Sequence, residues 1–178
     1  IIASNHTSPF DVPILMRHVK RKLDFVSIVE VFRHPLLGRI YGWMNAFPLD
    51  RTKPDSSTVR IILDRLAKGR VVAMFPEGGF RRFENSVLNG GPIKPGIGRL
   101  AMLANVPIVP AVVVNSQVYW RLSNWFPLRR TRYGVIFGPP LQRNADMDHS
   151  AAADDLEERL TQSFRALHVE ILATGKLT

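Results

Sequence analysis

The chain has 178 residues, 46% of them hydrophobic, which is enough to build one globular domain around its own core. It contains no cysteine, which excludes disulfides, cysteine metal ligands and a thiol nucleophile. Its formal net charge is +9, and no apolar run reaches the 18 or so residues of a membrane-spanning helix. Any membrane contact within these residues should therefore be peripheral.

The basic charge belongs to the first part of the chain and predicts an anionic partner. Residues 1–150 carry 21 lysines and arginines against 10 acidic residues, whereas residues 151–178 carry three against five. Such a field attracts anionic lipid headgroups, phosphorylated small molecules or nucleic acid. The sequence contains neither a zinc-finger frame nor an aromatic RNP motif, so we expect no nucleic-acid partner.

Hydrophobic periodicity and turn signals predict strands that alternate with helices. The last helix carries an apolar stripe, from Leu156 to Ile171, that is typical of core packing. The predicted elements are strand 1–4, helix 9–19, strand 25–29, helix 35–44, strand 46–49, helix 55–68, strand 71–75, helix 96–105, strand 107–114, strand 132–137 and helix 151–173. This alternation predicts one α/β domain, with a mostly parallel central sheet flanked by helices.

A histidine and an aspartate five positions apart lie at the first predicted strand-to-helix turn. Residues 5–11 read Asn-His-Thr-Ser-Pro-Phe-Asp, in which Ser8 can act as N-cap and Pro9 suits the first helical position. We expect the helix to begin between the two functional side chains, so that His6 in the turn is met by Asp11 one turn in. A carboxylate bonded to one imidazole nitrogen leaves the other nitrogen free to take a proton from a hydroxyl.

Other interpretations of this segment compete. Asp11 could be a capping acid that only complements the helix dipole, a stabilisation of about 0.3–1 kcal/mol. Ser8 lies close to His6, but the chain has no Gly-x-Ser-x-Gly elbow, so we interpret Ser8 as a cap rather than a nucleophile. The spacing alone does not decide, since His149 and Asp154 repeat it in a polar stretch that we interpret as surface.

A second block, residues 71–82, is predicted to be a buried strand that ends in a charged, glycine-rich loop. The carboxyl ends of strands are where α/β sheets carry their sites. Glycines let the backbone turn closely around a ligand, a glutamate accepts hydrogen bonds from hydroxyls, and arginines suit a phosphate. The alternative is an ordinary turn with solvated arginines. The candidate ligand-binding residues here are Glu77, Gly78, Gly79, Arg81 and Arg82.

Two further motifs complete an ordered set within the first 138 residues. Residues 47–51 read Phe-Pro-Leu-Asp-Arg, and residues 106–110 read Val-Pro-Ile-Val-Pro. Together with the His-x4-Asp of residues 5–11 and the Phe-Pro-Glu-Gly of residues 75–78, they resemble the motifs of the glycerolphosphate acyltransferases. The closest resemblance is to the 1-acylglycerol-3-phosphate O-acyltransferases of phospholipid synthesis. Four ordered motifs are far more specific than any one of them.

The resemblance implies an enzyme that moves a fatty acyl group from an acyl thioester, acyl-coenzyme A or acyl carrier protein, to the hydroxyl of a lysophospholipid. The first candidate acceptor is 1-acylglycerol 3-phosphate. It implies that His6 is the general base and Asp11 its orienting partner, in a direct transfer without an acyl-enzyme. It implies no metal and no cofactor beyond the thioester co-substrate. The residues implied to bind the acceptor are Arg51, Glu77, Gly78, Gly79, Arg81 and Arg82.

The chain departs from this family after Phe-Pro-Glu-Gly, where the usual Thr-Arg-Ser is replaced by Gly-Phe-Arg-Arg at residues 79–82. The arginine has therefore moved. Arg81 or Arg82 could bind the phosphate through a shifted loop, or Arg51 could do so with less help. The acceptor could then be glycerol 3-phosphate or another lysolipid. Rival functions are a metal hydrolase built on the same histidine and carboxylates, and a non-catalytic basic lipid-binding domain.

Two stretches, residues 32–44 and 118–130, mix basic residues with large apolar ones and could contact a membrane or an acyl chain. Packing of an irregular loop is the alternative for both. The chain starts at Ile1 within the first predicted strand, whereas the resemblance implies membrane-associating helices upstream. We therefore expect residues 1–178 to be a single catalytic domain of a longer protein, bound peripherally at the cytoplasmic face of a membrane.

Overall fold

The computed structural model describes residues 1–28, 39, 42, 45–49, 56–81, 83–120 and 132–175. The strands are β1 (Ile2–Ser4), β2 (Leu23–Ile28), β3 (Ala46–Leu49), β4 (Val71–Met74), β5 (Val109–Val114) and β6 (Gly134–Phe137). The α-helices are α1 (Asp11–His18), α4 (Ser56–Ala67), α5 (Ile97–Ala104) and α6 (His149–Thr174). Short 3-10 helices are η1 (Phe83–Asn85), η2 (Val87–Asn89) and η3 (Ser116–Trp120).

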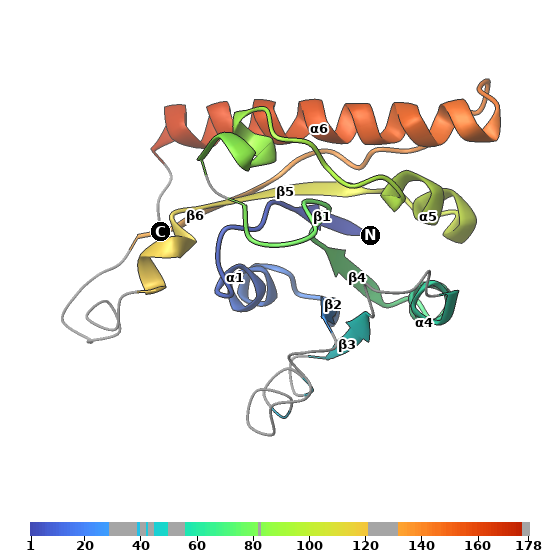
Figure 1. The fold of residues 1–178 in the computed structure, drawn as a ribbon, viewed down its shortest axis with the longest axis horizontal. Coiled ribbons are helices and arrows are strands. Elements are labelled where there is room, and N and C mark those ends of the chain that lie inside the picture. Colours follow the sequence, from blue (N-terminus) through green and yellow to red (C-terminus); the bar gives the residue numbers. More distant parts are fainter. Residues whose placement is uncertain are drawn as a thin grey trace.

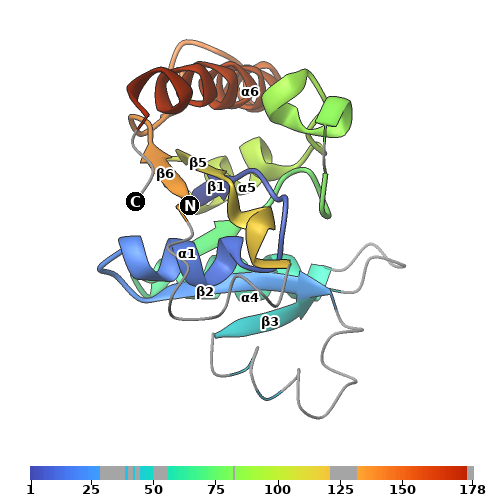
Figure 2. The same ribbon diagram turned by 90° about the vertical axis from the view of Figure 1, so that its left-hand side faces the viewer.

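Six strands form one sheet in the order β3-β2-β4-β1-β5-β6 (Figures 1 and 2). All neighbouring strands run parallel except β5 and β6, which are antiparallel. Ala3 of β1 pairs with Met74 of β4 on one side and with Pro110 of β5 on the other. The predicted mostly parallel α/β sheet is therefore confirmed. Because β1 and β4 are parallel neighbours, the loops that leave their carboxyl ends begin side by side.

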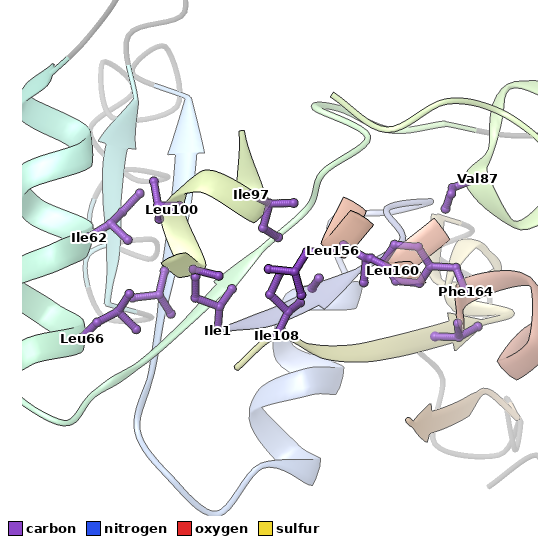
Figure 3. Close-up of a cluster of buried hydrophobic side chains, with 14 of the residues drawn as sticks. Ile1, Ile62, Leu66, Val87, Ile97, Leu100, Ile108, Leu156, Leu160 and Phe164 are labelled. Carbon is purple, nitrogen blue, oxygen red and sulfur yellow. The ribbon is translucent and has the colours of Figure 1, made fainter. Parts of the chain in front are cut away.

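Helices cover both faces of the sheet because side chains along a strand alternate between its faces. Ile1 and Ala3 join the apolar cluster shared with α4, α5 and α6, whereas Ile2 joins the cluster shared with α1. In Figure 1, α6 runs along one side of β1 and β5, and α1 lies on the other. Figure 3 shows the larger cluster, in which the labelled helix residues are Ile62, Leu66, Ile97, Leu100, Leu156, Leu160 and Phe164.

The predicted elements that fall on described residues agree with the observed ones to within a few residues at their ends. The last helix begins at His149, before its predicted start, because the Asp148 side chain accepts hydrogen bonds from the amides of Ser150 and Ala151. The three 3-10 helices were not predicted. The predicted helix 35–44 lies outside the described residues, apart from residues 39 and 42.

Two interpretations of the C-terminal part are confirmed. His149 and Asp154 are both exposed, so the pair that repeats the spacing of His6 and Asp11 is a surface pair. The apolar stripe of α6 is buried along its whole length and belongs to the larger core cluster.

Helices α5 and α6 meet at a close backbone approach. A Cβ placed on Gly98 would lie 2.3 Å from the carbonyl oxygen of Ala153. The amides of Gly96 and Gly98 at the start of α5 donate to the Glu157 carboxylate of α6, at 2.7 and 3.0 Å. A side chain of α6 thus satisfies the first amides of α5, which has no cap from its own sequence.

We expect Gly98→Ala to lower the free energy of unfolding by about 1–3 kcal/mol, because the added methyl group forces α5 away from α6. Urea denaturation measures the change. Arg99→Ala, at the exposed neighbouring position, serves as the matched control and should change stability by no more than about 0.5 kcal/mol. Equal stability of Gly98→Ala and the unmodified chain would show that the two helices can separate without loss.

Candidate active site

Asn5 fixes the chain direction directly after β1. Its side-chain amide donates to the carbonyl of Val113 at 2.9 Å, and its side-chain oxygen accepts from the amide of Val113 at 2.8 Å. The fully buried Asn5 side chain thus imitates one more pair of ladder bonds between β1 and β5. The loop that follows is therefore anchored where it leaves the sheet.

The buried carboxylate of Asp11 organises this loop. Its Oδ2 accepts from the His6 imidazole Nδ1 at 2.9 Å, from the Thr7 amide at 2.8 Å and from the Ser8 amide at 2.9 Å. Asp11 itself is 0% exposed. The predicted pairing of His6 with Asp11 is thereby observed as a hydrogen bond, and Asp11 does more than complement the dipole of α1.

The predicted start of this helix was wrong in detail. The helix begins at Asp11 with Phe10 at the N-cap, so Ser8 is not the cap, Pro9 is not helical and Asp11 is not one turn in. The reason is that the Asp11 carboxylate takes the Thr7 and Ser8 amides, which turns the preceding residues away from a helical path. The Ser8 hydroxyl accepts from the Phe10 amide at 3.1 Å.

Two phenylalanines enclose the His6 imidazole. The ring of Phe75 stacks on it with centroids 3.8 Å apart, and the ring of Phe80 is tilted over it at 4.4 Å. The His6 side chain is 14% exposed. With Nδ1 bonded to Asp11, the imidazole Nε2 makes no hydrogen bond to any described residue, and it is the nitrogen that can take a proton.

Glu77 ties the loop after β4 to the loop after β1. Its Oε2 accepts from the His6 amide at 2.6 Å, and its Oε1 accepts from the Val87 amide at 2.7 Å and the Ser86 hydroxyl at 3.0 Å. The side chain is 2% exposed. Burial raises the pKa of Glu77 above its ordinary value, and these three hydrogen bonds oppose the rise. A contact of Glu77 with an acceptor hydroxyl stays a prediction.

The glycine turn after Glu77 closes over His6. Gly78 has φ +70°, and its amide donates to the carbonyl of Phe75 at 2.9 Å. The Arg81 amide then donates to the carbonyl of His6 at 2.8 Å. Both backbone polar groups of His6 are thus held by the loop after β4, so the two sequence motifs form one unit.

The remaining predicted site residues divide into two groups. Gly79 and Arg81 lie in the loop that closes over His6, and Arg81 is exposed. Arg51 and Arg82 lie outside the described residues, as do nearly all of residues 32–44 and most of residues 118–130. Which arginine binds a phosphate stays a prediction.

Sequence reasoning missed several contributors to the site. The contacts of Phe75 and Phe80 with the imidazole were not predicted, nor was the Ser86 hydroxyl bond to Glu77. The position of Lys94 was not predicted either: a Cβ on Gly78 would lie 2.6 Å from its Cδ and Cε, so the lysine side chain crosses directly over the glycine turn. The replacement of Thr-Arg-Ser by a phenylalanine-containing sequence was the one signal that could have pointed to Phe80.

Two structural features bear on cofactors and membranes. Within the described ranges, no three histidine or acidic side chains lie close enough together to hold a metal ion. None of the helices in the same ranges combines the length and the hydrophobicity that a bilayer-spanning segment requires.

Comparisons with known proteins identify the family of the chain and a similar fold. The family model named Acyltransferase matches residues 1–114, so the chain belongs to the acyltransferase family. The fold is similar to the crystal structure of the 1-acyl-sn-glycerophosphate (LPA) acyltransferase PlsC from Thermotoga maritima, with a TM-score of 0.59 and 18% identity. That match covers 93% of this chain and 65% of the Thermotoga chain.

Similar sequences carry one name. The 1-acyl-sn-glycerol-3-phosphate acyltransferase of Limnanthes alba is 31% identical over 147 residues, which are 79% of this chain and 50% of the plant protein. The enzyme of the same name from Bacillus subtilis is 27% identical over 172 residues, 96% of this chain and 78% of the bacterial protein. The chain thus spans half the length of the plant relative and about three quarters of the Bacillus one.

We expect Glu77→Gln to lower the free energy of unfolding by about 1–3 kcal/mol, because an amide can accept hydrogen bonds on one side only and leaves a buried donor unsatisfied. Urea denaturation of the two proteins measures it. Glu158→Gln, at an exposed position of α6, is the control and should stay within about 0.5 kcal/mol. A Glu77→Gln protein as stable as the unmodified chain would mean that the three donors to Glu77 find other partners.

Proposed function

We propose that the chain transfers a fatty acyl group from an acyl thioester to the hydroxyl of 1-acylglycerol 3-phosphate, as a step of phospholipid synthesis. The donor would be acyl-coenzyme A or acyl carrier protein. The observation that carries the proposal is the 2.9 Å hydrogen bond from His6 Nδ1 to the buried carboxylate of Asp11, within a chain of the acyltransferase family. The shared name of the similar sequences supports the choice of acceptor.

In the proposed reaction, the imidazole Nε2 of His6 takes the proton of the acceptor hydroxyl as that oxygen attacks the thioester carbonyl. The new C–O bond forms, the C–S bond breaks, and the proton passes from Nε2 to the leaving thiolate. Asp11 holds the ring in the required tautomer and stabilises the imidazolium that forms in between. General-base help of this kind contributes about 10²–10⁴ in rate.

The glycine turn offers a candidate donor for the oxyanion that develops on the thioester carbonyl. The amide of Gly78 is already bonded to Phe75, which leaves the amide of Gly79 as the candidate. Arg81, in the same loop, is a candidate for the acceptor phosphate, together with Arg51 and Arg82. The exposed guanidinium of Arg81 forms no ion pair with any described residue, which supports this role.

The proposal extends to the setting of the enzyme. Residues 1–178 would form a single catalytic domain that binds peripherally to membrane lipids at the cytoplasmic face. The net charge of +9 supports this, because the cytoplasmic leaflet carries anionic lipids that attract basic surfaces.

The proposal is tested by thiol release from acyl-coenzyme A with and without 1-acylglycerol 3-phosphate in lipid micelles. We expect acceptor-dependent release that falls at least about a hundredfold in His6→Ala, because the general base is lost. His149→Ala is the matched control, since His149 has the same spacing to an aspartate on the surface of α6, and it should keep full activity. Thiol release that needs no acceptor would indicate a hydrolase. Thiol release that is unchanged in His6→Ala would refute the mechanism.

A separate variant distinguishes an orienting aspartate from a capping acid. Asp11→Asn keeps an oxygen for the neighbouring amides but removes the charge that faces the imidazolium. We expect kcat to fall at least about tenfold, with little change in KM for the acceptor. Steady-state kinetics in the same thiol assay measure both constants. Unchanged kcat with lowered stability would leave Asp11 a purely structural role.

A further inference from the structure

Phe83 is the most exposed large hydrophobic side chain among the described residues, at 81%. Three positions earlier, Phe80 is 47% exposed. Burying a side chain of this size is worth about 1.5–3 kcal/mol, so an aromatic ring kept in water points to a partner that covers it.

The backbone holds Phe83 outward at a cost. Its φ is +52°, a left-handed conformation that a bulky residue rarely adopts. The carbonyl of Phe83 accepts from the Ser86 amide at 3.1 Å and from the Asn89 side chain at 3.0 Å. Ser86 in turn donates to the buried Glu77 carboxylate, so hydrogen bonds hold the backbone that carries the exposed ring in place.

The same loop contacts the candidate general base, His6. Phe80 contacts the His6 imidazole, and the amide of Arg81 is bonded to the His6 carbonyl. A surface that covered Phe83 would therefore contact the loop that holds the imidazole. For an acceptor whose hydroxyl sits at the headgroup level of a bilayer, this is where the reaction must take place.

The charge around the loop favours a lipid surface over an apolar protein partner. The sequence places Arg81 and Arg82 between the two phenylalanines, against the single acid Glu84. Exposed Lys94 crosses the glycine turn of the same loop. Aromatic rings flanked by cationic side chains match an anionic membrane interface, where rings enter the acyl boundary and cations stay with the headgroups.

We propose that the loop of Phe80 and Phe83 inserts into an anionic lipid surface and holds His6 at the headgroup level, with Phe83 as the main anchor. This proposal rests on the proposed function, from which it takes the acceptor. The membrane binding that it predicts does not depend on turnover. The proposal assigns the lipid contact to a segment that is separate in the sequence from both basic-aromatic stretches, residues 32–44 and 118–130.

The test is co-sedimentation of the chain with vesicles of phosphatidylcholine and phosphatidylglycerol, compared with phosphatidylcholine alone. Phe83→Asn is the variant, since asparagine adopts a positive φ more readily than phenylalanine and should keep the fold. We expect its partition to anionic vesicles to fall at least about tenfold. Phe83→Trp should restore binding, and Leu103→Asn is the matched control.

Leu103 suits this purpose because it is 69% exposed and lies on α5, outside the loop of Phe80 and Phe83. Its replacement should leave vesicle binding unchanged. Activity separates the two proposals. Phe83→Asn should keep thiol release with a short-chain, monomeric acceptor and lose it in proportion to binding when the acceptor is embedded in vesicles.

If Phe83→Asn binds vesicles as well as the unmodified chain, or if it only changes the oligomeric state on a sizing column, the membrane anchor is refuted. That result would leave acyl transfer in micelles untouched. Phe83-dependent vesicle binding by a chain that releases no thiol would support the anchor and count against the proposed reaction.

Discussion

The buried carboxylate of Glu77 is the contact on which the candidate site depends. A carboxylate out of water is costly, and here three donors from two other segments offset that cost: the His6 amide in the loop after β1, and the Ser86 hydroxyl and Val87 amide at the start of η2. Each donor is satisfied only while the other segments stay in place. The position of the imidazole, of the turn over it and of the 3-10 segment behind it is therefore set cooperatively.

Sheet topology explains how residues 71 positions apart come to share one hydrogen bond. β1 ends at Ser4 and β4 ends at Met74, and the two strands are parallel neighbours. Their carboxyl ends lie at the same edge of the sheet, so the loops that follow them lie side by side and contact each other. Polar groups of loops this close to the core need partners, and the two loops satisfy each other's groups.

Sequence reasoning succeeded where the determining interactions are local or periodic. The strands and helices follow from hydrophobic spacing, and the bond between His6 and Asp11 follows from five residues of one turn. It failed where a tertiary contact decides. The carboxylate of Asp11 draws in the amides of Thr7 and Ser8, which overrides the usual preference for serine at an N-cap. The partners of Glu77 and the ring contact of Phe80 depend on loops that meet only in the folded chain.

The enclosure of His6 suggests why rigidity and lipid contact would be combined in one loop. Asp11 fixes one nitrogen, Glu77 and Arg81 fix the backbone, and two phenylalanines fix the ring plane, so the free nitrogen points in a set direction before any substrate arrives. If His6 is the base, as proposed, an imidazole this constrained cannot search for a hydroxyl. A long-chain acceptor held in a bilayer also has limited freedom, because its headgroup stays at a fixed depth. Contact between such a base and such an acceptor then requires that the protein bind the membrane at the matching depth. An exposed aromatic side chain on the loop that contacts His6 would fix this depth directly.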